Sequence, residues 1–125
     1  MTPPSDALRD ALAELIAIPS VSADIAHAGD IDAAAAWVAQ RIRDGGGTAE
    51  LVPWGERPLV IGEIPASQMS ESAPTILCYA HFDVQPADPL ELWESPPFEL
   101  TQRDGKLWAR GVADDKGNLF TLVEA

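Results

Sequence analysis

A histidine and an aspartate, two residues apart, follow an uncharged apolar segment in the middle of the chain. The segment is 75–80, and His81 and Asp83 come directly after it. In an extended chain such residues project to the same side, about 6.6 Å apart. The imidazole can then ligate a metal while the carboxylate orients the ring, or the pair can carry out acid–base chemistry. A histidine that merely hydrogen-bonds the backbone at a strand end is the third interpretation, and these residues alone leave all three open.

Two adjacent aspartates form a second candidate site. Asp114 and Asp115 precede Lys116 and Gly117, where a helical pattern begins. Carboxylates near a helix N-terminus are stabilised by free backbone N–H groups and by the helix dipole, so capping alone can explain them. Like charges side by side are costly unless a cation or several donors offset them. A metal ion that prefers oxygen ligands would do so, and capping and metal binding therefore both stay open.

Two helices are predicted before these motifs. Ser5 can cap the first, which carries one apolar stripe and ends before Pro19; the stripe consists of Leu8, Leu12, Leu15 and Ile16. Asp30 is predicted to cap the second helix, which runs to about Asp44 and stops at three glycines, 45–47.

Extended segments follow the second helix. We expect strands at 49–52 and 59–64, and a hairpin in which 98–101 and 106–109 flank Asp104-Gly105. The run 75–80 is apolar throughout, which is typical of a strand buried on both faces of a parallel sheet. Ligands bind beyond the carboxyl ends of such strands, where His81 and Asp83 lie. The predicted fold class is α/β, with helices packed on a mostly parallel sheet, in a single domain that covers 1–125.

Composition excludes several function classes. The net charge is −12, from 8 Lys+Arg and 20 Asp+Glu, which argues against a nucleic-acid partner because phosphate binding needs clustered basic residues. No apolar run approaches the ~18 residues of a membrane span, and the N-terminus lacks the pattern of a signal peptide. The one cysteine, Cys78, permits no internal disulfide, and we interpret it as a buried, inert thiol. The cytoplasm is the expected location.

Three motifs, taken together in their order and spacing, are similar to those of a known enzyme family. They are His-Phe-Asp-Val-Gln-Pro at 81–86, Trp-Glu-Ser-Pro-Pro-Phe at 93–98, and the segment 104–117 that ends in Asp-Asp-Lys-Gly. They resemble the co-catalytic di-zinc peptidase family, which includes carnosine dipeptidases, bacterial dipeptidases, acetylornithine deacetylase and succinyl-diaminopimelate desuccinylase. The segment 15–22 resembles the exit of that family's first helix, so the resemblance covers nearly the whole chain.

The resemblance implies a role for each motif residue. His81 would ligate one of two zinc ions, and Asp114 would bridge the two ions. Asp83 would serve catalysis by holding the His81 ring from behind. The peptide bond between Asp114 and Asp115 would be cis, and Lys116 and Gly117 would shape the turn.

The resemblance also implies what the chain lacks. The fold would be the N-terminal part of a zinc-aminopeptidase-like catalytic domain. The general base, the remaining metal ligands and the small lid or dimerisation domain would lie beyond Ala125. We therefore expect a truncated chain that is inactive by itself, and a homodimer is one assembly that the resemblance allows for the parent.

The expected reaction is hydrolysis of a peptide bond in a small peptide, with a dipeptide favoured, by water that two zinc ions activate. Deacylation of N-acyl amino acids is the alternative within the family. A non-catalytic remnant that acts as an acidic binding module is the alternative outside it. The motif residues bind metal and water rather than substrate, so the sequence does not separate the two enzymes.

Overall fold

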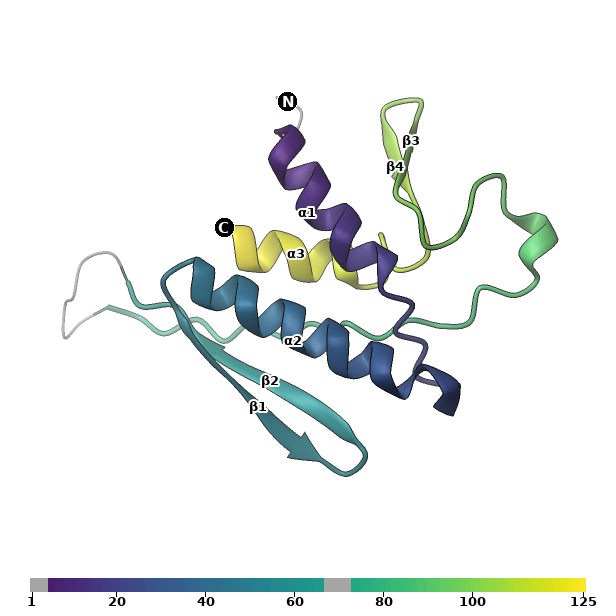
Figure 1. Cartoon of the computed structure of the whole chain (residues 1–125). Coiled ribbons are helices and arrows are strands. Elements are labelled where there is room, and N and C mark those ends of the chain that lie inside the picture. The colour runs from purple at the N-terminus through teal and green to yellow at the C-terminus, as the bar shows by residue number, and fades with distance from the viewer. Residues whose placement is uncertain (1–4, 67–72) are drawn as a thin grey trace.

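The computed structural model describes residues 5–66 and 73–125. Its elements, in chain order, are α1 (Asp6–Ala17), the 3-10 turn η1 (Ile25–His27), α2 (Ala28–Asp44), β1 (Thr48–Trp54), β2 (Arg57–Glu63), the 3-10 turn η2 (Leu90–Leu92), β3 (Thr101–Arg103), β4 (Lys106–Trp108) and α3 (Lys116–Glu124). Helix α2 contacts the hairpin β1–β2, and α1 contacts α3. Figure 1 shows α2 between this hairpin and the other two helices.

Helix α1 forms as its sequence predicts. The Ser5 hydroxyl accepts a hydrogen bond from the Leu8 backbone N–H at 3.3 Å and caps the helix. The helix ends at Ala17, two residues before Pro19, which cannot continue it. The predicted stripe faces the interior, since Leu8 is half-buried and its other members are buried; these are Leu12, Leu15 and Ile16.

Helix α2 ends at Asp44, directly before the three glycines, as predicted. The predicted cap at Asp30 is wrong, because the helix already begins at Ala28 with His27 at the N-cap position. Asp30 lies in the first turn, where its carboxylate is 2.6 Å from Nδ1 of His27. The side chain of Asp30 therefore binds a neighbouring ring rather than a free backbone N–H.

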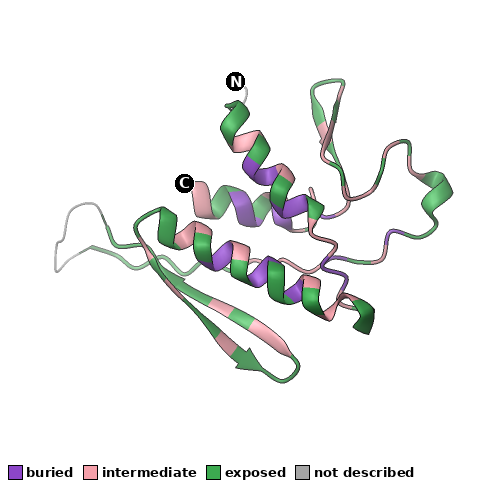
Figure 2. Ribbon diagram, in the orientation of Figure 1, coloured by how far each residue is buried: buried purple, intermediate pink, exposed green. Residues whose placement is uncertain are grey.

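The core lies where the three helices face one another, as the buried positions in Figure 2 show. One cluster joins α1 to α3 through Ala11, Leu12, Ile16 and Phe120. A second cluster joins all three helices through Leu15, Val38 and Leu119. Trp37 packs against both clusters, so it connects them. Within the described part of the chain, no helix is long and apolar enough to cross a membrane.

Both sheets are antiparallel hairpins. Strands β1 and β2 pair from Thr48↔Glu63 to Trp54↔Arg57. Strands β3 and β4 pair around the predicted turn, in which Asp104 and Gly105 have φ values of 51° and 72°. Positive φ at both central residues is what a type I′ turn requires, so the predicted turn is confirmed. The first strand is misplaced by the prediction, since it covers Thr101–Arg103 rather than 98–101. Among residues 5–66 and 73–125, the only parallel pairing is the single bridge between Val21 and Val84.

The buried strand predicted at 75–80 is wrong for this chain. The segment belongs to no sheet in the described residues, and its large side chains are exposed: Ile76 by 81%, Leu77 by 95% and Tyr79 by 88%. Cys78 is exposed as well, which contradicts its interpretation as a buried thiol. An apolar run is buried on both faces only when other strands flank it and helices cover it. Among the described residues no strand flanks this segment, and within it only Ala80 packs against the helical core.

Two leucines with opposite environments test this packing. Leu15 is fully buried, and shortening it to alanine should cost about 2–5 kcal/mol of unfolding free energy. Leu77 has no contacts to lose, so Leu77→Ala in the same chain should change that free energy by no more than about 0.5 kcal/mol. Urea denaturation of the two variants measures both values. A Leu77→Ala loss as large as that of Leu15→Ala would contradict the exposed segment.

Candidate metal centre

Three segments that are distant in sequence converge at the candidate site. The first is the exit of α1, where Ser20 accepts a hydrogen bond at its carbonyl from the Val84 N–H at 2.9 Å. The Ser20 hydroxyl also donates to the carbonyl of Phe82 at 2.6 Å, and the N–H of Ser22 donates to the Val84 carbonyl at 3.3 Å. These bonds fix the second segment, 81–84, beside the first. The third segment is the turn that precedes α3.

The structure brings His81, Asp83 and Asp114 together, as predicted, but not at the end of a strand, because 75–80 forms none. Nε2 of His81 is 3.0 Å from Oδ1 of Asp114. Nδ1 of the same ring is 3.1 Å from both the carbonyl and a carboxylate oxygen of Asp83. The ring is therefore held from one side by Asp83 and presents its other nitrogen to Asp114. The Asp114 side chain is 83% exposed, so solvent reaches this pair of donors.

The two adjacent aspartates have different partners. The peptide bond between Asp114 and Asp115 is cis, as the family resemblance implies. One oxygen of Asp115 accepts a hydrogen bond from the His81 backbone N–H at 3.1 Å, and the other accepts from the Asn118 amide at 2.7 Å. Asp115 occupies the N-cap position of α3, but its side chain makes no capping bond. The capping interpretation is therefore wrong for this carboxylate, which instead holds the backbone of His81.

Lys116 is fully buried directly after the two aspartates. Its Nζ donates to the carbonyls of Leu15 and Ile18, at 2.9 Å and 2.6 Å. Burial lowers the pKa of this lysine to about 8, although Asp30 and Asp83 oppose the effect. The motif placed Lys116 in a turn but did not reveal these partners. The last turn of α1 contains no basic residue, but nothing in the sequence shows that Lys116 is the cation at that end.

Glycine is required where the turn enters α3. A Cβ added to Gly117 would lie 2.0 Å from the carbonyl oxygen of Val112, far inside van der Waals contact. The backbone of the turn can therefore approach this closely only without a side chain. The role that the resemblance gave Gly117, shaping the turn, agrees with this contact.

The charges around His81 favour its protonated form in the absence of a metal. Partial burial of the ring lowers the pKa of His81, but the carbonyl and carboxylate of Asp83, with the carboxylate of Asp114, outweigh that effect. The pKa consequently lies above its ordinary value of 6.5. The site is thus electrostatically suited to a cation, whether a proton on the ring or a metal ion beside it.

The donor set fits part of a zinc site. An imidazole nitrogen and a carboxylate oxygen are both ligands that zinc takes in proteins, and they face each other here at 3.0 Å. A catalytic zinc keeps about three protein ligands and one open position. Across residues 5–66 and 73–125, no group of three or more His, Cys, Asp or Glu side chains is arranged to hold a metal ion. His81 and Asp114 are therefore a partial ligand set.

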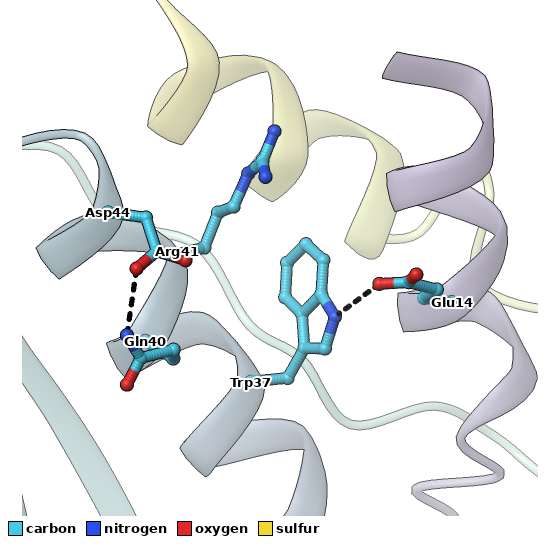
Figure 3. Close-up of a pocket in the computed structure, with 5 residues that line it drawn as sticks. All are labelled: Glu14, Trp37, Gln40, Arg41 and Asp44. Carbon is cyan, nitrogen blue, oxygen red and sulfur yellow. Dashed lines mark hydrogen bonds between the residues drawn. The ribbon is translucent and has the colours of Figure 1, made fainter. Parts of the chain in front are cut away.

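A separate hollow between the helices offers no comparable chemistry. It is lined by Glu14, Trp37, Gln40, Arg41 and Asp44 (Figure 3). These side chains bind each other or α3: the Trp37 ring N–H donates to Glu14, the Gln40 amide donates to Asp44, and Arg41 pairs with Glu124. None of the sequence-predicted site residues lies in it, so the pair of His81 and Asp114 remains the candidate.

Comparison with known proteins finds similarity over the segments that carry the site. Residues 77–125, which include both motifs of the site, match the family described as Peptidase family M20/M25/M40. A cysteinylglycine-S-conjugate dipeptidase from Corynebacterium striatum is 35% identical over 126 residues, which cover 100% of this chain and 27% of that protein. A succinyl-diaminopimelate desuccinylase from Verminephrobacter eiseniae is 38% identical over 122 residues, 90% of this chain and 29% of that protein.

Solved structures share the fold over nearly the whole chain. Human carnosine dipeptidase 1 matches with a TM-score of 0.84 and 28% identity, over 95% of this chain and 27% of that chain. An M20 family metallo-carboxypeptidase from Sulfolobus solfataricus matches with a TM-score of 0.82 and 32% identity, over 96% of this chain and 26% of that chain. By sequence and by fold, this chain is similar to members of the M20/M25/M40 peptidase family.

This similarity confirms the predicted fold class and agrees with the predicted enzyme class. The chain has the fold of the N-terminal α/β part expected from the resemblance, although the described residues form antiparallel hairpins rather than the parallel portion of a sheet. The matched family is described as a peptidase family, and the two solved structures are named as a dipeptidase and a metallo-carboxypeptidase. The chain spans between about a quarter and a third of the length of these relatives.

The electrostatics of the site can be tested without any metal. In chelator-treated protein, the His81 ring should titrate above 6.5, and Asp114→Asn should lower its pKa by removing a charged neighbour. NMR titration of the imidazole signals measures this, with Asp32→Asn on the exposed side of α2 as the matched control. A His81 pKa at or below 6.5, or one that Asp114→Asn leaves unchanged, would contradict the described contacts.

Proposed function

We propose that the protein carrying this chain hydrolyses a peptide bond in small peptides, dipeptides above all, in a reaction that depends on two zinc ions. The observation that carries the proposal is the solvent-open contact between Nε2 of His81 and Oδ1 of Asp114, within a segment that matches this peptidase family. Two similar proteins are named as dipeptidases, which supports dipeptides as the substrate class. We place the protein in the cytoplasm, since its one cysteine suits a reducing compartment.

Three residues of this chain have proposed roles at the centre. His81 and Asp114 would hold zinc, with Asp114 between the two ions. Asp83 would keep the His81 ring oriented, so that Nε2 stays directed at the metal. When bound, zinc supplies polarisation of the scissile carbonyl and activation of the attacking water. Asp115 would keep the His81 backbone in place through the hydrogen bond from its N–H.

Hydrolysis of N-acyl amino acids is the second candidate. It is supported by the 38% identity to a protein named as a succinyl-diaminopimelate desuccinylase. Both reactions break an amide bond with the same metal chemistry. His81, Asp83 and Asp114 act on metal and water rather than on the substrate side chain, so they do not distinguish the two reactions. A panel of dipeptides and N-acyl amino acids, assayed with zinc, separates the two.

Substitutions in the complete protein test the proposed roles. Asp114→Ala should abolish turnover because it removes the bridging ligand, and His81→Ala should have nearly the same effect. Asp83→Asn should reduce the rate less, by about 10–100-fold, because the ring keeps its position at the Asp83 carbonyl but loses a charged partner. Asp32→Ala, an exposed aspartate on α2, is the control and should keep full activity. The measurement is kcat/KM for a dipeptide.

Either of two results would reject this assignment. If Asp114→Ala kept full activity, Asp114 would not be a ligand of the metal centre. A folded, zinc-loaded protein that hydrolyses neither dipeptides nor N-acyl amino acids would favour a non-catalytic binding module instead.

The 125-residue chain taken alone should bind zinc weakly and should not hydrolyse these substrates. Its described residues offer two facing donors where a catalytic zinc takes about three. Calorimetric titration with zinc, beside a dipeptide assay, checks both expectations. Tight binding of two zinc ions per chain, or metal-dependent turnover, would show that the chain carries a complete site.

A further inference from the structure

Lys116 carries a charge into the interior beside the candidate metal centre. Its exposure is 0%, whereas the chain's other lysine, Lys106, is exposed on β4. Buried lysines are rare unless their ammonium group is paired or hydrogen-bonded. Here the ammonium donates to two carbonyl oxygens, those of Leu15 and Ile18.

These two carbonyls belong to the C-terminal end of α1. Each already accepts one backbone N–H, the Leu15 carbonyl from Ile18 at 3.4 Å and the Ile18 carbonyl from Ser20 at 2.9 Å. Each keeps a second lone pair for a donor from elsewhere. A cation at this end is also favoured by the helix dipole. Because α1 has no basic residue in its own last turn, Lys116 supplies the charge from about 100 residues further along the chain.

The same lysine is connected by packing contacts to the residues of the metal centre. Its stem packs against Gly111, where an added Cβ would lie 3.4 Å from Cδ of Lys116 and 2.7 Å from a methyl group of Val84. Val84 in turn is paired with Val21 at the exit of α1. The exit of α1, the segment 81–84 and the turn before α3 thus form a closed ring of contacts, and Lys116 links the turn to α1.

We propose that Lys116 is a positioning residue of the metal centre, whose two hydrogen bonds to α1 fix the place of the Asp114 carboxylate relative to the His81 ring. The proposal rests on the proposed function, since it deepens the role of the same centre. If Lys116 only stabilised the fold, its loss would disturb the position of Asp114 no more than the loss of any core residue does. The two roles therefore differ in how metal binding responds to its loss.

The test compares three variants of the complete protein. Lys116→Met keeps most of the stem and removes the donor. Lys106→Met makes the same change at an exposed lysine, and Leu12→Ala weakens the core of α1 while it keeps Lys116. Zinc affinity is measured by competition with a chromophoric chelator, at a temperature where circular dichroism shows every variant folded. Lys116→Met should bind zinc about 10–100-fold more weakly, while both controls should stay within about twofold of the unmodified protein.

A second readout uses the metal-free protein. Lys116→Met should shift the imidazole ¹⁵N signals of His81, and Leu12→Ala should not, although it lowers the urea midpoint. Unchanged zinc affinity and unchanged His81 signals in Lys116→Met would overturn the proposal, as would an equal loss of affinity in Leu12→Ala. If the unmodified protein binds no zinc, the proposed metal centre fails, and the His81 signals still decide whether Lys116 positions the ring and Asp114.

Should Lys116→Met not fold, Lys116→Arg replaces it. Arginine keeps a cation that can donate to both carbonyls, but its longer side chain displaces the turn. Folded protein with weakened zinc binding is then expected, and zinc binding equal to that of the unmodified protein would overturn the proposal.

Discussion

The hydrogen bond from the His81 backbone N–H to the Asp115 carboxylate joins two parts of the chain that are 34 residues apart. The candidate centre depends on it, because it places the turn that carries Asp114 beside the ring of His81. The turn is anchored on its far side as well, by Asn118 on Asp115 and by Lys116 on α1. Asp115 and Lys116 anchor the turn, whereas the carboxylate of Asp114 is left exposed and is therefore available to a metal.

Residues close in sequence were enough to predict where the helices and the hairpin turn around the centre begin and end. Ser5 and Pro19 delimit α1, three glycines stop α2, and Asp104-Gly105 forms the hairpin turn, because each of these depends on residues within a few positions. The segment 75–80 shows where local signals fail. Its apolar side chains indicate a strand that can be buried, but burial depends on distant strands and helices that cover it, and the described residues leave it exposed.

The same distinction explains what was predictable in the site. His81, Asp83 and Asp114 follow from residue type and motif order, and the structure brings the three together although the strand expected before His81 does not form. The partners of Asp115 and Lys116 were not predictable. For Asp115 the local alternative was helix capping, whereas its actual partner is a backbone N–H far away in sequence. For Lys116 the acceptors lie 98 and 101 residues away, which no motif spacing indicates.

The central claim is that His81 and Asp114 are brought together to share a metal. Crystals of the complete protein grown with zinc, measured at the zinc absorption edge, test it most directly through the anomalous signal. The account predicts a zinc ion about 2.0–2.2 Å from a His81 ring nitrogen and from an Asp114 oxygen, with Asp83 still behind the ring. Zinc bound only at other residues, with Nε2 of His81 and the Asp114 carboxylate still in direct contact, would contradict it.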